Sequence, residues 1–209
     1  MKIFLIRWVG HGLVDALFPA TSFGRVGDQE ANEKIPRATV SCYPTLKYTL
    51  KVGEEFIAVD TPGCLNLRCT WDQELEKAHG VVYVVDSTDE IRFPVVRQEF
   101  QMVLNVLSNR TDACIVPCLI FATKNDLRSA AKSSQIVEVA GIAETCCKLA
   151  APWSMMKCSA LDWYSVKDGI KWLLKQIDTI RAINPEDLAQ ASSGFQLANE
   201  SFYYQQRSS

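Results

Sequence analysis

The chain has 209 residues, of which 48% are hydrophobic and 22% charged, and its formal net charge is −2. These values fit one globular domain with a full core, and they exclude the strongly basic surface that nucleic acids require. No apolar run reaches the ~20 residues of a membrane span, and Lys2 in place of glycine leads us to expect no myristoyl anchor.

Eight cysteines are many for this length, but none forms a Cys-x-x-Cys pair, and the only histidines are His11 and His79. A zinc site is therefore a poor explanation for the cysteines. No secretory cleavage pattern follows the first apolar residues. We expect a cytoplasmic chain whose thiols are reduced and mostly buried.

Strand patterns and helix patterns alternate along the chain. Strands are predicted at residues 3–8, 46–50, 56–59, 81–85, 118–122 and 153–157. Helices are predicted at residues 13–19, 95–107, 133–149 and 166–177. The second and third strands form an antiparallel pair, and the remaining alternation predicts a parallel sheet covered by helices on both faces.

The first strand leads into a segment with the layout of a phosphate-binding loop but not its chemistry. Such a loop follows G-x-x-x-x-G-K-[ST]: glycines let the backbone curl round phosphate, lysine contacts the outer phosphates and the hydroxyl binds Mg²⁺. Arg7 stands at the first glycine, Gly12 at the second, Leu13 at the lysine and Val14 at the hydroxyl. The segment gains weight from the motifs that follow it.

Polar motifs stand at the ends of four later strands: Asp60-Thr61-Pro62-Gly63, Asp86-Ser87, Thr123-Lys124-Asn125-Asp126 and Cys158-Ser159-Ala160. Their order and spacing resemble a Ras-like small GTPase, and more closely the ADP-ribosylation factor (Arf/Arl) family. Trp71 falls where that family has a tryptophan after its D-x-G-G-Q motif, and residues 84–89 are similar to its V-V-D-S-x-D. A weaker likeness runs to the β subunit of the signal recognition particle receptor.

The resemblance covers roughly residues 2–177 and implies an α/β small GTPase (Ras-like P-loop NTPase) fold. That fold has a six-stranded, mostly parallel sheet with helices on both faces. We therefore expect an Arf-like G domain at residues 1–181 and a C-terminal extension at residues 182–209.

The resemblance assigns guanine recognition to Thr123, Lys124 and Asp126. An aspartate has only acceptors, so Asp126 can accept two hydrogen bonds from guanine N–H groups and select guanine over adenine. The Lys124 stem would lie over the ring, and the backbone at Ser159 and Ala160 would contact the guanine oxygen. The family usually begins this motif with asparagine rather than threonine. An alternative is that both motifs serve only to tie loops together.

The resemblance also implies that Asp60 holds Mg²⁺ through water and that the N–H of Gly63 meets the γ-phosphate. The family's next residue is a glutamine that orients the attacking water, but this chain has Cys64. Because a thiol is a weak, poorly directed hydrogen bonder, we expect no catalytic residue and no hydrolysis by the ordinary route. A switch hydroxyl for Mg²⁺ could come from Thr39, the first candidate, or from Ser41.

The altered loop has a calculable cost. Each charge-assisted hydrogen bond contributes ~1.5–3 kcal/mol, and the loss of the lysine and the Mg²⁺ ligand removes at least two. The sum of ~3–6 kcal/mol corresponds to ~10²–10⁴ in affinity. Arg7 and His11 remain as alternative cations.

These residues predict a non-hydrolysing pseudo-GTPase that acts as a protein-interaction module, with no cofactor as the first expectation and GTP or GDP with Mg²⁺ as the alternative. Two other functions stay open. One is a GTP-binding, and if active GTP-hydrolysing, regulatory switch of the Arf/Arl family in intracellular or ciliary traffic. The other is a structural subunit of a large assembly. We expect protein partners and neither nucleic acid contact nor a direct membrane anchor.

From about Pro185 the chain becomes polar and aperiodic, yet this segment contains Phe195, Leu197, Phe202, Tyr203 and Tyr204. Clustered aromatic residues are common anchors of interfaces, so one interpretation is a segment that docks partners together with the switch-region surface. The other interpretation is a disordered terminus.

Overall fold

The computed structural model describes residues 1–7, 46–52, 54–61, 68, 71–110, 112, 114–159, 161–183 and 185–207. Its strands are β1 (Lys2–Arg7), β2 (Leu46–Val52), β3 (Glu54–Thr61), β4 (Gly80–Asp86), β5 (Cys118–Thr123) and β6 (Trp153–Lys157). Its helices are α2 (Trp71–Leu75), α3 (Phe93–Ser108), α4 (Ser133–Val139), α5 (Ile142–Cys146), α6 (Trp163–Arg181) and α7 (Leu188–Arg207), with 3₁₀ helices η2 (Glu90–Arg92) and η3 (Pro185–Asp187).

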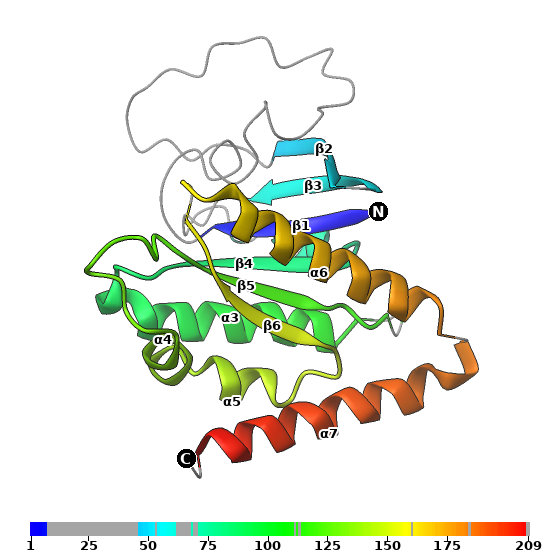
Figure 1. The fold of residues 1–209 in the computed structure, drawn as a ribbon. Coiled ribbons are helices and arrows are strands. Elements are labelled where there is room, and N and C mark those ends of the chain that lie inside the picture. Colours follow the sequence, from blue (N-terminus) through cyan, green and yellow to red (C-terminus); the bar gives the residue numbers. More distant parts are fainter. Residues whose placement is uncertain are drawn as a thin grey trace.

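The six strands form one sheet in the order β2-β3-β1-β4-β5-β6. Only the β2–β3 pair is antiparallel, and β1 lies parallel between β3 and β4, with Ile3 opposite both Ala58 and Gly80. Figure 1 shows the strands stacked from β2 at one edge to β6 at the other. The predicted six-stranded, mostly parallel sheet is therefore confirmed.

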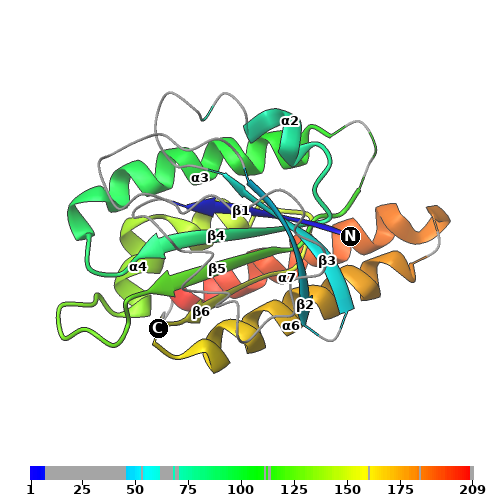
Figure 2. The ribbon, with the colours of Figure 1, turned by 90° about the horizontal axis from the view of Figure 1, so that it is seen from above.

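Helices cover both faces of the sheet, with α3 on one side and α6 on the other (Figure 2). The central strand β4 shows why its sequence is apolar throughout. Val81, Tyr83 and Val85 belong to one buried cluster, whereas Val82 and Val84 belong to a second cluster on the other face. A parallel strand that is buried on both faces has no polar side to present to water.

The helix predicted at residues 133–149 is two helices in the structure, α4 and α5. Gly141 separates them with a φ of +59°, in the left-handed region that glycine adopts without a Cβ penalty. The apolar spacing continues across this break, which is why it suggested one helix. The helix predicted at residues 13–19 lies outside the described residues.

The C-terminal segment is helical over Leu188–Arg207, in contrast to the aperiodic segment that its composition suggested. Leu188, Ala191 and Phe195 share one helical face and pack against the larger core cluster. The side-chain amide of Asn199 donates to the carbonyls of Leu149 (2.7 Å) and Ala151 (3.1 Å). The structure therefore has a helix where one interpretation of the sequence expected a disordered terminus. The docking role of this segment and the domain boundary at residue 181 stay predictions.

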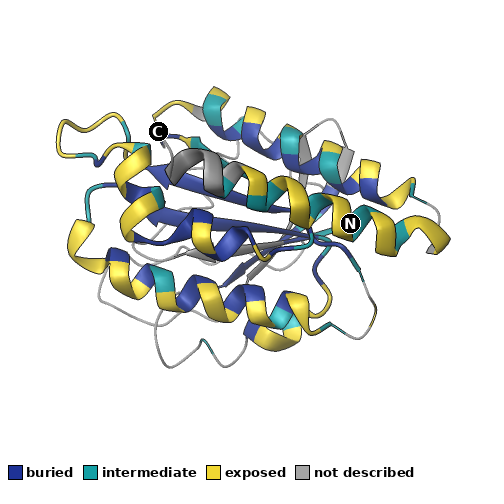
Figure 3. Ribbon diagram, turned by 90° about the horizontal axis from the view of Figure 1, so that it is seen from below, coloured by how far each residue is buried: buried dark blue, intermediate teal, exposed yellow. Residues whose placement is uncertain are grey.

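Viewed from below, α7 exposes its outer face along most of its length (Figure 3). Among the described residues, no helix combines the length and the apolar character that crossing a membrane requires.

The five described cysteines carry free thiols, and four of them are buried. Burial raises the pKa of Cys118 and of Cys158 to about 12. These thiols stay protonated and are poor nucleophiles at neutral pH. The described residues contain no cluster of three or more side chains that could hold a metal ion.

Candidate nucleotide-binding site

Three hydrogen bonds tie together the segments that follow β4 and β5. The Thr123 hydroxyl donates to the Val85 carbonyl at 3.0 Å, and the Ser87 N–H donates to the Thr123 carbonyl at 3.1 Å. The Ala131 N–H then donates to the Ser87 carbonyl at 2.8 Å. Both strands are parallel, so their carboxyl ends, and the polar motifs that follow them, meet at the same edge of the sheet.

Lys124 is held in an unusual backbone conformation. Its φ of 58° places a non-glycine residue in the left-handed region, a strained arrangement that the surroundings must enforce. Its ammonium Nζ lies 2.6 Å from Oδ2 of Asp86, and the other oxygen of Asp86 accepts from the N–H (2.9 Å) and the hydroxyl (2.7 Å) of Thr88. The turn at residues 123–126 is thereby fixed to the end of β4.

Asp86 is almost fully buried, with 8% of its surface exposed. Burial acts to raise the pKa of this carboxyl, but hydrogen bonds from Lys124 and Thr88 outweigh it and hold the pKa below its ordinary value. Asp86 is therefore charged at neutral pH, as the ion pair with Lys124 requires.

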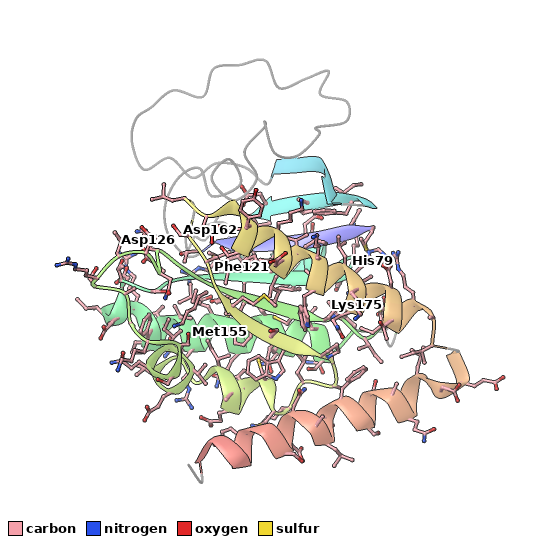
Figure 4. The ribbon with its side chains drawn as sticks, viewed as in Figure 1. His79, Phe121, Asp126, Met155, Asp162 and Lys175 are labelled. Carbon is pink, nitrogen blue, oxygen red and sulfur yellow. The ribbon has the colours of Figure 1, made fainter. Side chains whose placement is uncertain are left out.

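The turn after β6 lies against the same loop. The Asn125 N–H donates to the Cys158 carbonyl at 3.3 Å, and Cys158 in turn donates its N–H to Ala122. The buried Ser159 accepts from the N–H groups of Leu161 and Asp162. Asp126 has an exposed side chain, and Figure 4 places it and Asp162 at the end of the sheet opposite His79. The structure thus brings Thr123, Lys124, Asp126 and Ser159 together.

The end of β3 contributes Asp60, which is 2% exposed and lies opposite Leu5 of β1 in the strand register. Beyond it, Arg68 forms an ion pair with Glu99 of α3, and its guanidinium carbon lies 5.8 Å from the centroid of the Trp71 ring. Trp71 is 3% exposed at the start of α2. The tryptophan of the Arf-like pattern is therefore a buried residue that joins α2 to the core.

The phosphate half of the predicted site falls largely outside the described residues: Gly12, Leu13, Val14, Thr39, Gly63 and Cys64, together with Ala160 of the base half. Arg7 is the last residue of β1 and lies opposite Val84, and only its backbone is described. The roles predicted for these residues stay predictions.

The residues predicted to recognise guanine lie close together at one end of the sheet. They offer an exposed carboxylate at Asp126, a lysine beside it in a fixed turn, and a second turn at Ser159 bonded to the first. The sequence analysis did not predict that Asp86 holds Lys124 in place, because there Asp86 marked only the end of a strand. Its register opposite Thr123 of β5 is a long-range feature that the order of the motifs hints at but does not specify.

The sequence matches the model of the ADP-ribosylation factor family over residues 29–177. It is 32% identical over 129 residues to ADP-ribosylation factor-related protein 1 of Rattus norvegicus and, with the same values, to that of Mus musculus. These alignments cover 61% of this chain and 61% of the relatives' own length. The structure of the Arl6 BBS3 small GTPase from Trypanosoma brucei, with bound nucleotide analogue GppNp, matches with a TM-score of 0.65 at 20% identity. That match covers 86% of this chain and 99% of the other, and it shows a shared fold.

Proposed function

Because the chain belongs to the ADP-ribosylation factor family of small GTPases, we propose that it is a non-hydrolysing member that works as a protein-interaction module. One observation carries this proposal. Leu13, Val14 and Cys64 stand where a GTPase of this family places lysine, a hydroxyl and glutamine. The range matched to the family begins at residue 29, so Leu13 and Val14 lie outside it.

The three substitutions act on different parts of the chemistry. Leu13 cannot neutralise the outer phosphates, and Val14 cannot ligate Mg²⁺. Their combined cost of ~3–6 kcal/mol weakens triphosphate binding by ~10²–10⁴. Cys64 cannot direct a water molecule for in-line attack, so hydrolysis fails even where nucleotide is held. No cofactor is then required for the protein to present its surface to a partner.

A second candidate is a GTP-binding regulatory switch, and the fixed turn at residues 123–126 favours it. Lys124 is held there by Asp86 in a left-handed backbone conformation. In this candidate Thr123, Lys124, Asp126, Ser159 and Ala160 hold the base. In the same candidate Gly12 and Gly63 would contact the phosphates, and Asp60 and Thr39 would bind Mg²⁺. The charge of the metal ion would offset the charge of the phosphates.

Protein partners are part of both candidates. The switch-region surface, together with the C-terminal helix, would present the contacts. A role in intracellular or ciliary traffic belongs to the switch candidate, and a structural subunit of a large assembly is a separate alternative. A cytoplasmic location is proposed for each of them. The net charge of −2 is consistent with protein rather than nucleic acid partners.

The nucleotide content of the purified protein tests the proposal directly. The protein is purified without added nucleotide, denatured, and its supernatant separated by ion-exchange chromatography. We expect far less than one guanine nucleotide per chain and no phosphate release from added GTP. Stoichiometric GDP or GTP would favour the switch candidate and overturn the proposed role.

A restored loop gives the matched experiment. The double variant Leu13→Lys with Val14→Thr is expected to bind GTP with Mg²⁺ ~10²–10⁴ more tightly than the natural chain, because it regains two charge-assisted contacts. Adding Asp126→Asn should abolish that gain by removing the base acceptor. Titration of a fluorescent GTP analogue measures all three proteins. Equal affinity of the natural and double-variant chains would show that the substitutions do not limit binding.

A further inference from the structure

We propose that the outer edge of β6, at Met155 and Lys157, binds an extended, basic segment of a partner protein, which adds to the sheet as a seventh strand. The binding site is a groove between this edge, α4, α5 and α7. The inference names a partner surface for the proposed interaction role and rests on it, but it involves none of the nucleotide-binding residues.

The groove has a volume of about 1270 Å³. It exceeds the ~300–1,000 Å³ of most small-molecule sites. Its lining comes from α4 and α5 with the glycine between them, from β6, and from the second half of α7. Figures 1 and 4 show β6 as the last strand of the sheet, with Met155 on it and α7 running past that edge.

The backbone of β6 offers hydrogen-bonding groups toward the groove. The Pro152 carbonyl accepts from the N–H of Cys118 in β5, and the Cys158 N–H donates to the carbonyl of Ala122 in β5. In a parallel pair alternate residues point to the same neighbour, so Met155 and Lys157 point their N–H and C=O groups away from β5. Within the described part of the chain, no hydrogen bond engages these groups. A free row of this kind is a template for another strand.

The dimensions of this edge favour an extended occupant. Five residues of β6 span about 16 Å at ~3.3 Å per residue, which suits a segment of about five residues. Trp153 and Met155 are half-buried on the side of α4 and α5, where they pack against the larger core cluster. Alternate side chains of an added strand would meet this apolar floor, and the others would face outward.

The charge of the groove selects a basic segment. Among the described residues of its lining, Glu138 and Glu144 carry the charge. Glu144 is partly neutralised by an ion pair with Arg97, whereas Glu138 is exposed and engages no cation among the described residues. A lysine or arginine in the partner segment would complement Glu138, and an acidic segment would be repelled.

The C-terminal helix gives the groove its second wall. Asn199 is anchored to the carbonyls of Leu149 and Ala151, directly before β6 begins. Ala198 and Tyr203 line the groove from the same stretch of α7. The extension thus has a defined part in the site, because its anchor sets the distance between α7 and the strand edge.

The experiment uses the full-length natural chain and a seven-residue peptide in which lysine alternates with valine. Amide NMR spectra are recorded during titration, followed by hydrogen exchange. We expect shift changes confined to β6, α4, α5 and α7, with exchange at Met155 and Lys157 slowed at least tenfold. Alternate N-methylation of the peptide in one register should weaken binding at least tenfold, whereas methylation in the other register should not.

Charge variants supply the matched control. Glu138→Lys should weaken binding of the lysine peptide at least fivefold, whereas Glu186→Lys, an equal change at an exposed position in η3 outside the lining, should leave it unchanged. Equal effects, equal affinity for a glutamate–valine peptide, or shifts elsewhere would overturn the inference. Dimerisation that slows hydrogen exchange at Met155 and Lys157 without peptide would show that the edge binds a second copy of the chain. That result would also overturn the inference.

The two proposals fail separately. If the peptide does not bind and the chain carries no nucleotide, the groove inference falls while the proposed function stands. If the peptide binds to a chain that holds stoichiometric GTP, the groove inference stands and the nucleotide-independent role falls.

Discussion

At the scale of single residues, two glycines in long helices stand in opposite surroundings. A Cβ built on Gly169 of α6 would lie 2.5 Å from two ring atoms of Phe121, which is itself fully buried in β5. A Cβ on the exposed Gly194 of α7 would meet no atom within 4 Å. Gly169 therefore permits α6 to approach the sheet closely, whereas Gly194 has no such packing role.

We expect Gly169→Ala to destabilise the protein by about 1–2 kcal/mol, because crowding of a buried ring outweighs the gain in helix propensity. Gly194→Ala should stabilise it by about 0.5–1 kcal/mol, because the propensity gain is then unopposed. Urea unfolding of both variants measures the two free energies. Shifts of the same sign would contradict the packing role of Gly169.

His79 is a second residue with a measurable signature. Its imidazole Nδ1 accepts from the backbone N–H of Lys2 at 3.3 Å, and the backbone N–H of His79 donates to the Lys2 carbonyl. Burial, with Arg181 and other positive groups, lowers its pKa below the ordinary 6.5. The imidazole therefore takes up a proton at a higher pH in the unfolded chain than in the folded chain. As a result, the free energy of unfolding decreases as the pH falls below ~6.5 toward the pKa of the folded state.

We expect the free energy of unfolding to fall more between pH 7.5 and pH 5.5 in the natural chain than in His79→Gln, which cannot titrate at this position. Urea unfolding at both pH values measures the difference, and His11 and the carboxylates are common to the two proteins. A steeper fall in the variant would contradict the sign of the shift.

At the scale of elements, the ion pair of Arg68 and Glu99 joins the segment after β3 to α3. Both side chains are nearly enclosed, at 12% and 10% exposure. The second oxygen of Glu99 lacks a hydrogen-bond partner within the described residues. Water screens so enclosed a pair only weakly, so losing one member should cost more than losing a member of an exposed pair.

We expect Glu99→Ala to cost about 1–3 kcal/mol of stability and to alter the fluorescence of Trp71, over which Arg68 lies. The exposed pair of Arg97 and Glu144 provides the comparison, with side chains 38% and 47% exposed. Glu144→Ala should cost less than ~0.5 kcal/mol. Thermal and urea unfolding measure the loss of stability in each variant. Equal losses would show that the buried pair contributes no more to stability than the exposed pair does.

At the scale of the whole molecule, α7 raises the question of where the domain ends. Leu188, Ala191 and Phe195 pack against the main core cluster, and Asn199 bonds to two carbonyls beside the sheet. This helix is therefore continuous with the domain in its contacts, although composition alone placed it apart.

Ending the chain after Asp187 is expected to cost about 2–4 kcal/mol, because two large apolar side chains lose contacts worth up to ~1.5–3 kcal/mol each when fully buried. Dye binding to the newly exposed core should increase, and the melting temperature should fall. An unchanged melting temperature would instead support an independent domain at residues 1–181.

Much of the fold could be predicted from the sequence, since continuous apolar runs such as Val81–Val85 in β4 are distinctive for buried parallel strands. Other features depend on distant partners. The apolar face of α7 is diluted by serine and glutamine, so it becomes visible only beside the core that it covers. The residues predicted to recognise the base follow a local motif, whereas the support that Asp86 gives to Lys124 depends on strand register.

The anchor at Asn199 has a consequence for how the protein is made. Synthesis proceeds from the N-terminus, so the sheet and its flanking helices leave the ribosome before the residues that satisfy the Leu149 and Ala151 carbonyls. During that interval the nascent chain presents an uncovered hydrophobic strip beside an unpaired strand. That strip stays open to other hydrophobic contacts until α7 has emerged and packed against it.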